Sequence, residues 1–110
     1  MPSMTNYRAG DIVLVNFPLA GNVKSKQRPA LVLLDTGDAD LLLARITTQR
    51  YQTAYDVALT DWQAAGLKAP SAVRLHKLAT LEKTLVQRLL GNIQTSDRQK
   101  ISKVLLFANW

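Results

Sequence analysis

The hydrophobic positions in the first half of the chain form short runs that Gly, Pro and polar residues separate. Runs that are rich in β-branched and aromatic residues and bounded by turn residues are typical of strands. The second and third runs are almost continuously apolar, which predicts strands near the middle of a sheet. Pro29 begins the second run, at a first strand position where a missing N–H is tolerated. The predicted strands are residues 11–17, 29–34, 41–48 and 55–59, with a polar loop over 18–27 and a hairpin turn over 36–40.

The second half of the chain contains one clearly alternating segment. Residues 71–78 place Val73 and Leu75 on one side and Arg74 and His76 on the other. Strict alternation of apolar and polar residues indicates a strand with one buried face. This segment is therefore predicted to be a half-buried strand.

Two helices are predicted in the second half. Residues 60–66 form the first, a short helix with Thr60 or Asp61 as its cap and Gly66 as its end. Near the C-terminus, the segment Ser96–Gln99 is a capping box, with Ser96 as the N-cap. An amphipathic helix with one core-facing side should follow it. The apolar positions of that helix are Ile101, Val104, Leu105 and Ala108.

Residues 80–93 fit two patterns. The spacing of Leu85, Leu89 and Ile93 suits a helix, whereas Thr-Leu-Val at 84–86 could extend the sheet. The whole chain then has five or so short strands and one or two helices. Because no crossover helices separate the early strands, we expect a mainly β fold built on a small, strongly curved antiparallel sheet. At 110 residues, the chain is expected to be one domain, residues 1–110.

Composition excludes several classes of protein. The chain has no cysteine and one histidine, His76, so we expect neither a thiolate metal site nor a histidine metal cluster within one chain. No apolar run approaches the roughly 18 residues of a transmembrane helix, and residues 1–8 lack the apolar core of a signal peptide. A cytoplasmic protein is expected. The net charge of +6 and the pI near 10.0 indicate an anionic partner, with ordinary solubility charge as the alternative.

One basic segment leads directly into the second apolar run. Residues 24–34 contain two lysines, an arginine and no acid, and Arg28 stands where polar residues give way to apolar ones. A cation where a loop joins a buried strand is held by the scaffold and still reaches solvent, as binding and catalytic groups often do. Phosphate is the natural ligand of such a cluster. A surface ion pair is the alternative for Arg28.

A series of short blocks covers almost the whole chain. They are GDIVLVNFP (10–18), QRPALVL (27–33), ITTQ (46–49), DWQAAGL (61–67), SAVR (71–74), KLATL (77–81) and LGNIQTSD (90–97). In this order and spacing the blocks resemble the MazF/PemK/Kid family of toxin endoribonucleases, and the later blocks resemble its PemK-like branch.

The resemblance implies an SH3-like β-barrel with a C-terminal helix, assembled as a homodimer. It implies the toxin of a type II toxin–antitoxin system, which inhibits growth by cleaving single-stranded RNA, often mRNA, at a short sequence without a metal or other cofactor. The expected partner is an antitoxin whose acidic, flexible C-terminal segment occupies the RNA groove; with it, the toxin is expected to bind DNA. By their positions in the blocks, Arg28 and Thr47 are implied as catalytic, with Thr48 a near alternative to Thr47.

The chemistry of Arg28 and Thr47 suits attack by the RNA 2′-OH on the adjacent phosphorus. Negative charge then grows on the non-bridging oxygens, and a guanidinium can stabilise it through two N–H bonds. Arginine has no accessible neutral form in ordinary surroundings, which argues against a role for Arg28 as a base. Arg28 is therefore expected to stabilise charge, with proton donation to the 5′-oxygen as a possible second role. The Thr47 hydroxyl can bond a phosphate oxygen or the 2′-OH; bonding its own backbone is the alternative.

The remaining polar candidates also have two interpretations. His76 is a possible base for the 2′-OH and Arg74 a possible phosphate ligand, unless both belong to a solvated polar face. Some relatives in the family carry an acid where His76 stands, so that acid's role does not transfer. The residues that could contact RNA, or could be merely exposed and polar, are Lys24, Lys26, Gln27, Gln49 and Arg50.

Aromatic and acidic residues add little to this picture. Trp62, Tyr55 and Trp110 could stack on unpaired bases, but core or dimer packing is the alternative. Asp11 and Asp56 lack the spacing of a metal-binding pair, so a two-metal nuclease is not expected.

Two other functions fit the sequence. One is a non-enzymatic toxin with the same barrel that binds a topoisomerase, which would not need Arg28 and Thr47 side by side. The other is a noncatalytic nucleic-acid-binding module, which would bind with a strong salt dependence and leave its ligand uncut.

Overall fold

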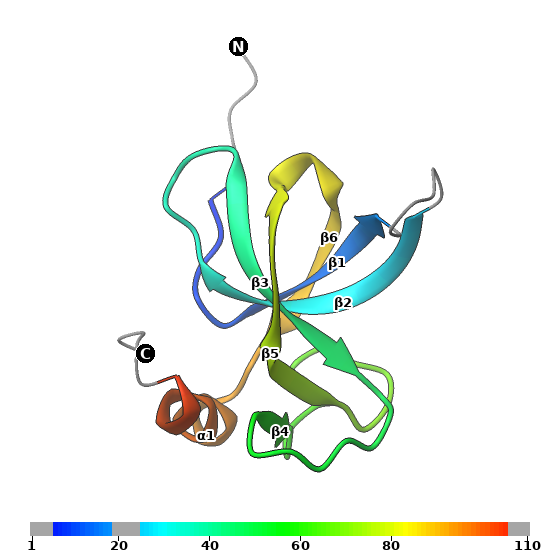
Figure 1. Cartoon of the computed structure of the whole chain (residues 1–110), viewed down its shortest axis with the longest axis vertical. Helices are drawn as coiled ribbons and strands as arrows, with labels where there is room; N and C mark the ends of the chain where they lie inside the picture. The colour runs from blue at the N-terminus through cyan, green and yellow to red at the C-terminus, as the bar shows by residue number, and fades with distance from the viewer. Residues whose placement is uncertain (1–5, 19–24, 106–110) are drawn as a thin grey trace.

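Six strands form one antiparallel sheet in the computed structural model of the chain, which describes residues 6–18 and 25–105 (Figure 1). The elements are β1 (Asp11–Pro18), β2 (Ser25–Leu34), β3 (Asp40–Thr47), β4 (Asp56–Ala58), β5 (Ala72–Glu82), the 3-10 helix η1 (Lys83–Leu85), β6 (Val86–Asn92) and α1 (Thr95–Val104). The strand order is β4-β5-β3-β2-β1-β6, so the two apolar runs predicted to be central are central.

The central strands bury side chains on both faces of the sheet. Because successive residues of a strand point to opposite faces, the neighbours Ile12 and Val13 of β1 belong to two different apolar clusters. The first cluster contains Ile12 and is covered by α1 through Ile101. The second contains Val13 and Leu43, and Leu85 of η1 packs against it. A slip of one residue between strands would exchange the two sets of side chains, so double burial fixes the register.

The sheet is strongly curved and barrel-like, mainly β with one C-terminal helix, as the resemblance implied (Figure 1). Register shifts interrupt the β1–β6, β2–β3 and β3–β5 pairs. Such irregularities bend a strand and increase its twist, which lets a short sheet wrap around its core. Within the described ranges, no helix is long and apolar enough to cross a membrane.

The ambiguous segment 80–93 belongs to the sheet. Its residues complete β5, form the single turn of η1 and return as β6, which pairs with β1 through Val13↔Leu89 and Asp11↔Asn92. The helical spacing of its leucines therefore does not produce a helix, because pairing with a distant strand outweighs the local pattern.

The predicted loop over 18–27 is wrong at both ends. Strand β1 continues to Pro18, and β2 begins at Ser25, so Lys26 and Gln27 are paired with β1 rather than looped out. Pro29 consequently lies inside a strand, opposite Leu14, and not at its first position. The pairs with β3 begin only at the next residue, so β2 has one paired neighbour at Pro29. That position is equivalent to a sheet edge, where proline is tolerated.

The predicted helix over 60–66 is only a single turn. The Ala65 N–H donates to the Asp61 carbonyl at 3.1 Å, as in an α-helix, but the Gly66 N–H donates to the Gln63 carbonyl at 3.1 Å and no further turn follows. Gly66 ends the turn with a φ of 95°, which glycine adopts without a steric penalty. The predicted end of the segment was therefore right and its helical extent was wrong.

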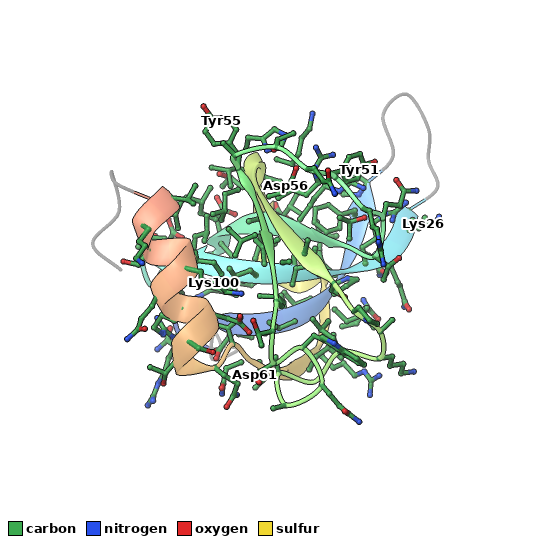
Figure 2. The ribbon with its side chains drawn as sticks, turned by 90° about the horizontal axis from the view of Figure 1, so that it is seen from below. Lys26, Tyr51, Tyr55, Asp56, Asp61 and Lys100 are labelled. Carbon is green, nitrogen blue, oxygen red and sulfur yellow. The ribbon has the colours of Figure 1, made fainter. Side chains whose placement is uncertain are left out.

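Asp97 joins α1 to this turn. Its carboxylate is fully buried and accepts the N–H groups of Thr60 at 2.8 Å and Asp61 at 2.9 Å. The Lys100 ammonium lies 3.1 Å from the carboxylate and donates to the Ala58 carbonyl at 2.7 Å, bridging from α1 toward the end of β4 (Figure 2). Burial raises the pKa of Asp97, but the two backbone N–H groups and Lys100 outweigh burial and hold that pKa below its ordinary value.

The predicted capping box at Ser96 does not form. The helix begins two residues earlier than predicted, its N-cap is Gln94 without a side-chain bond, and the Ser96 hydroxyl donates to the Asp61 carboxylate at 3.1 Å. The Ser96 side chain, which the local pattern assigned to the helix cap, therefore bonds to Asp61 in the turn over 60–66 instead. The predicted core-facing side is confirmed for Ile101 and Leu105, which are buried. Its last position, Ala108, lies outside the described residues.

Replacing Asp97 should be costly. We expect Asp97→Ala to lower the free energy of unfolding by about 3 kcal/mol, because it leaves two buried N–H groups without an acceptor and removes the partner of Lys100. Chemical denaturation of the variant and the wild type measures the difference. Asp38→Ala is the matched control. It removes an exposed carboxylate that accepts the Asp40 N–H at 2.9 Å and should cost less than about 1 kcal/mol, because water can replace that bond. Equal effects of the two substitutions would contradict the proposed structural role of Asp97.

Candidate nucleic-acid interface

A pocket of about 320 Å³ opens where β2, β3 and β5 lie side by side. It lies on the face of the sheet that carries the second cluster, beyond the apolar residues of that cluster. Among the residues that the structure describes, its lining is polar and basic and contains no acid. The lining residues are Gln27, Arg28, Pro29, Arg45, Ile46, Thr47, Thr48, Gln49, Tyr51, Ser71 and Arg74.

Strand register brings these side chains together. Arg45 of β3 is paired with Ala30 of β2 on one side and with Arg74 of β5 on the other. Continuing the β2–β3 register by two residues sets Arg28 opposite Thr47, and both line the pocket. Side chains two residues apart on a strand share a face. The period of the strands therefore places these groups on one surface, although they come from distant parts of the chain.

Arg74 is held by three neighbours. Its Nε donates to the Asp56 carboxylate of β4 at 2.9 Å, and its side chain is only 12% exposed. The guanidinium carbon lies 3.6 Å from the centre of the Tyr51 ring, a cation–π contact. Its Nη2 lies 3.2 Å from Nε2 of His76, and since arginine only donates, that imidazole nitrogen accepts. Figure 2 shows Tyr51, Tyr55 and Asp56 gathered on one side of the molecule.

The Asp56 carboxylate is kept charged by its bonds. Burial raises the pKa of Asp56, but the Thr53 hydroxyl, the Arg74 guanidinium and the Thr53 N–H donate to it, and together they hold the pKa below its ordinary value. Arg74 therefore keeps a fully ionised partner at neutral pH. This fixes its position within the pocket.

Among the described residues, the Thr47 hydroxyl accepts one hydrogen bond and keeps its own hydrogen as a donor. It accepts the N–H of Gln49 at 3.1 Å, the local backbone contact that the sequence left open as an alternative. A hydroxyl that accepts in this way still has its hydrogen available for a ligand oxygen. The Gln49 side chain is fixed as well, because its carbonyl oxygen accepts the Tyr51 hydroxyl at 2.6 Å.

A second, less polar pocket of about 290 Å³ continues from the first. The two share Thr47, Thr48, Gln49, Tyr51 and Ser71, and the second adds Arg50, Gln52, Ala58, Pro70 and Ala72. A polar, cationic hollow that runs into a more apolar one suits a ligand with a charged backbone and flat, weakly polar groups, such as an unpaired nucleic acid strand.

The structure gathers most of the predicted site residues but not all. Arg28, Gln27, Thr47, Thr48, Gln49 and Arg74 line the first pocket, and Arg50 lines the second. His76 is exposed and reaches the pocket only through Arg74. Lys26 is exposed at the start of β2 and lines neither pocket (Figure 2). Lys24 lies outside the described residues.

The aromatic and acidic candidates are also placed. Trp62 packs against the first cluster, which agrees with core packing, the alternative to base stacking. Tyr55 is 56% exposed, with its ring centre 5.7 Å from that of His76. Asp56 pairs with Arg74, and Asp11 accepts the Arg8 N–H at 2.9 Å. Trp110 lies outside the described residues. Among the described residues, no group of three or more His, Asp or Glu side chains is placed to hold a metal ion.

Three lining residues with polar side-chain groups were missed from the sequence: Arg45, Tyr51 and Ser71. Arg45 had a signal, because it stands two positions before Thr47 in a predicted strand and so shares its face. Tyr51 had none, and Ser71 had a misleading one, because the predicted strand over 71–78 places it on the side of Val73 and Leu75. They reach the pocket through the loop after β3 and the chain before β5, whose paths no local pattern specifies.

The chain matches the family described as the PemK-like, MazF-like toxin of type II toxin–antitoxin systems over residues 8–108. It belongs to this family. No curated protein matches the sequence significantly.

Solved structures share the fold. An endoribonuclease in complex with its cognate antitoxin from a mycobacterial species is 21% identical, with a TM-score of 0.75 over 94% of each chain. The Mycobacterium tuberculosis toxin MazF-mt6 is 20% identical, with a TM-score of 0.71 over 91% of this chain and 99% of that one. A MazE–MazF structure (Form-II) from Deinococcus radiodurans is 21% identical, with a TM-score of 0.69 over 88% and 89%. At these identities, the likeness concerns the fold.

The ion pair in the site makes a pH-dependent prediction. We expect Asp56→Asn to lower the free energy of unfolding at pH 7 by about 1–3 kcal/mol, because a buried charge-assisted bond to Arg74 is lost. A carboxyl with a lowered folded-state pKa contributes stability above its unfolded pKa, about 3.9, and loses it as pH falls through the folded-state value. The difference between variant and wild type should therefore shrink below about pH 4. Urea denaturation at pH 7 and pH 3 measures it; a difference that does not change with pH would contradict this role.

Proposed function

We propose that this protein is the toxin of a type II toxin–antitoxin pair and an endoribonuclease that cuts single-stranded RNA at a short sequence in the cytoplasm. The observation that carries the proposal is that Arg28 of β2 and Thr47 of β3 line the same basic pocket. Membership of the toxin family supports it. So do the named activities of the mycobacterial proteins that share the fold.

The proposed reaction is an internal transfer of the phosphoryl group. The 2′-oxygen forms a bond to phosphorus while the bond from phosphorus to the 5′-oxygen breaks. The 2′-OH gives up a proton and the 5′-oxygen gains one, so the products are a 2′,3′-cyclic phosphate and a 5′-OH. Arg28 would stabilise the negative charge that grows on the phosphoryl oxygens and on the departing 5′-oxygen. Because arginine keeps its own proton, water would supply the proton that the 5′-oxygen gains. The free hydrogen of Thr47 would hold a phosphate oxygen, and no cofactor is required.

Arg74 and His76 would assist this reaction from β5. Arg74 is fixed by Asp56 and Tyr51 at the pocket and would bind phosphate. His76 is the candidate for accepting the 2′-OH proton, because imidazole is the usual acid–base group in proteins. Its Nε2 accepts from Arg74, so that role requires the contact to open when RNA binds.

The proposed partners follow from the positive charge of the pocket. A basic pocket with no acid among its described lining residues would accept the acidic, flexible segment of an antitoxin as well as RNA, and the two would compete. We further propose that two copies of the chain form the working unit. Sedimentation of the free protein tests the dimer, and displacement of a labelled oligonucleotide by an acidic antitoxin peptide tests the competition.

Removing Arg28 should abolish most of the cleavage. We expect Arg28→Ala to lower kcat by about 10²–10³, the usual effect of deleting a group that stabilises an oxyanion. A diverse pool of single-stranded RNAs, incubated with the protein and EDTA, provides the substrate, and sequencing of the new 5′ ends reports the cut sites. Wild-type cleavage should persist in EDTA, since the proposed chemistry uses arginine in place of a metal.

Lys103→Ala is the control, because it removes an exposed cation from the last turn of α1, away from the pocket. Its cleavage should match that of the wild type. Full activity of Arg28→Ala, or no cleavage by the wild type across the pool, would overturn the assignment. Growth arrest with intact RNA would instead favour the non-enzymatic toxin that binds a topoisomerase.

A further inference from the structure

Three adjacent strands each carry an arginine to the same pocket. Arg28 of β2, Arg45 of β3 and Arg74 of β5 all line it. Within residues 6–18 and 25–105, Asp56 is the only carboxylate that pairs with any of them, and it pairs with Arg74. Two guanidinium groups therefore face the pocket without a carboxylate partner among the described residues.

Arg45 occupies a position that is unfavourable for a cation. It is the direct cross-strand neighbour of Arg74, and β-carbons of directly opposed residues are about 4.5–5.5 Å apart, where like charges destabilise a sheet. It is also partly buried, so its charge is incompletely solvated. On the other side, its neighbour is Ala30, which is too short to cover it. Asp56 balances the charge of Arg74, so the charge of Arg45 is the one left unmatched among the described residues. An unmatched, partly buried cation costs stability unless a further anion offsets its charge.

We propose that Arg45 binds a phosphate of the RNA strand, and that this phosphate is a neighbour of the one held by Arg28. If the β2–β3 register is continued past its last pair, Ala30↔Arg45, Arg28 is a diagonal neighbour of Arg45. Diagonal neighbours in a sheet are about 7–8 Å apart. A guanidinium can engage two oxygens of one phosphate by itself. Two such groups, set apart along the pocket, fit successive phosphates of one strand. This inference rests on the proposed function for the identity of the ligand.

Contact with a phosphate that does not react has a kinetic signature. Such a contact is equally strong in the ground state and the transition state, so its loss weakens binding and leaves kcat unchanged. It should also lower the salt dependence of binding, since each neutralised phosphate of a single strand contributes about 0.7 to the slope of log K against log salt.

The test compares Arg45→Ala with Arg88→Ala in the full-length protein. Arg88 is an exposed arginine on the edge strand β6 and lines neither pocket, so both variants lose one positive charge. A fluorescein-labelled oligodeoxynucleotide, which has no 2′-OH and cannot be cut by the proposed route, is titrated at several salt concentrations. RNA cleavage and thermal unfolding are measured in parallel.

We expect Arg45→Ala to weaken oligonucleotide binding about tenfold and to reduce the salt slope by about 0.7, with kcat for RNA within about twofold of the wild type. Its melting temperature should equal or exceed that of the wild type, because the repulsion with Arg74 is gone. Arg45→Lys should keep most of the salt slope. Arg88→Ala should leave the affinity near that of the wild type.

Several outcomes would overturn the inference. The first is an affinity and a salt slope for Arg45→Ala that match those of Arg88→Ala. The second is a loss of kcat in Arg45→Ala without a loss of binding. The third is a lowered melting temperature of Arg45→Ala, which would indicate a structural role. If the proposed function is wrong but this inference is right, the results differ from those above. The wild type would cut no RNA, while binding of the uncleavable strand would still depend on Arg45. If the wild type binds no single strand, both proposals fall.

Discussion

Strand β3 buries side chains on both of its faces, and this requirement sets the position of the groups in the pocket. Leu43 belongs to one apolar cluster and its neighbour Ala44 to the other, so β3 cannot slip by one residue against β2 or β5 without exposing both sets. The same register carries Arg45 and Thr47 past the end of the second cluster. Apolar burial thus fixes the polar site, which needs few interactions of its own to be positioned.

Charge is distributed unevenly over this scaffold. Asp56 and Tyr51 hold Arg74 in a defined position, whereas Arg28 and Arg45 have no carboxylate partner among the described residues. Asp97 and Lys100, by contrast, form an ion pair within the chain. The Asp97 carboxylate also accepts two backbone N–H groups, and these contacts attach α1 to the rest of the fold. Charges that are matched within the chain stabilise the fold. Charges that are unmatched at a pocket are available to an anionic ligand.

Much of this could be predicted from the sequence where one local pattern dominates. The apolar runs of β2 and β3, the alternation around Arg74 and the buried side of α1 follow directly from periodicity. The predictions that were wrong depend on distant partners. Residues 80–93 form strands because β1 pairs with them, and Ser96 is drawn from its cap by Asp61. In the pocket, Tyr51 and Ser71 arrive on connecting segments, so no strand period could have indicated them.

The most direct measurement concerns the nucleophile. Once a cut site is known, an RNA with a single 2′-deoxy nucleotide on the 5′ side of the scissile bond is compared with the all-ribose strand. If the basic pocket acts by stabilising attack of the 2′-OH, the single substitution abolishes cleavage at that bond. Binding should be little changed, and the ribose strand should yield a 2′,3′-cyclic phosphate by mass spectrometry. Cleavage of the 2′-deoxy strand at the same bond would contradict the mechanism.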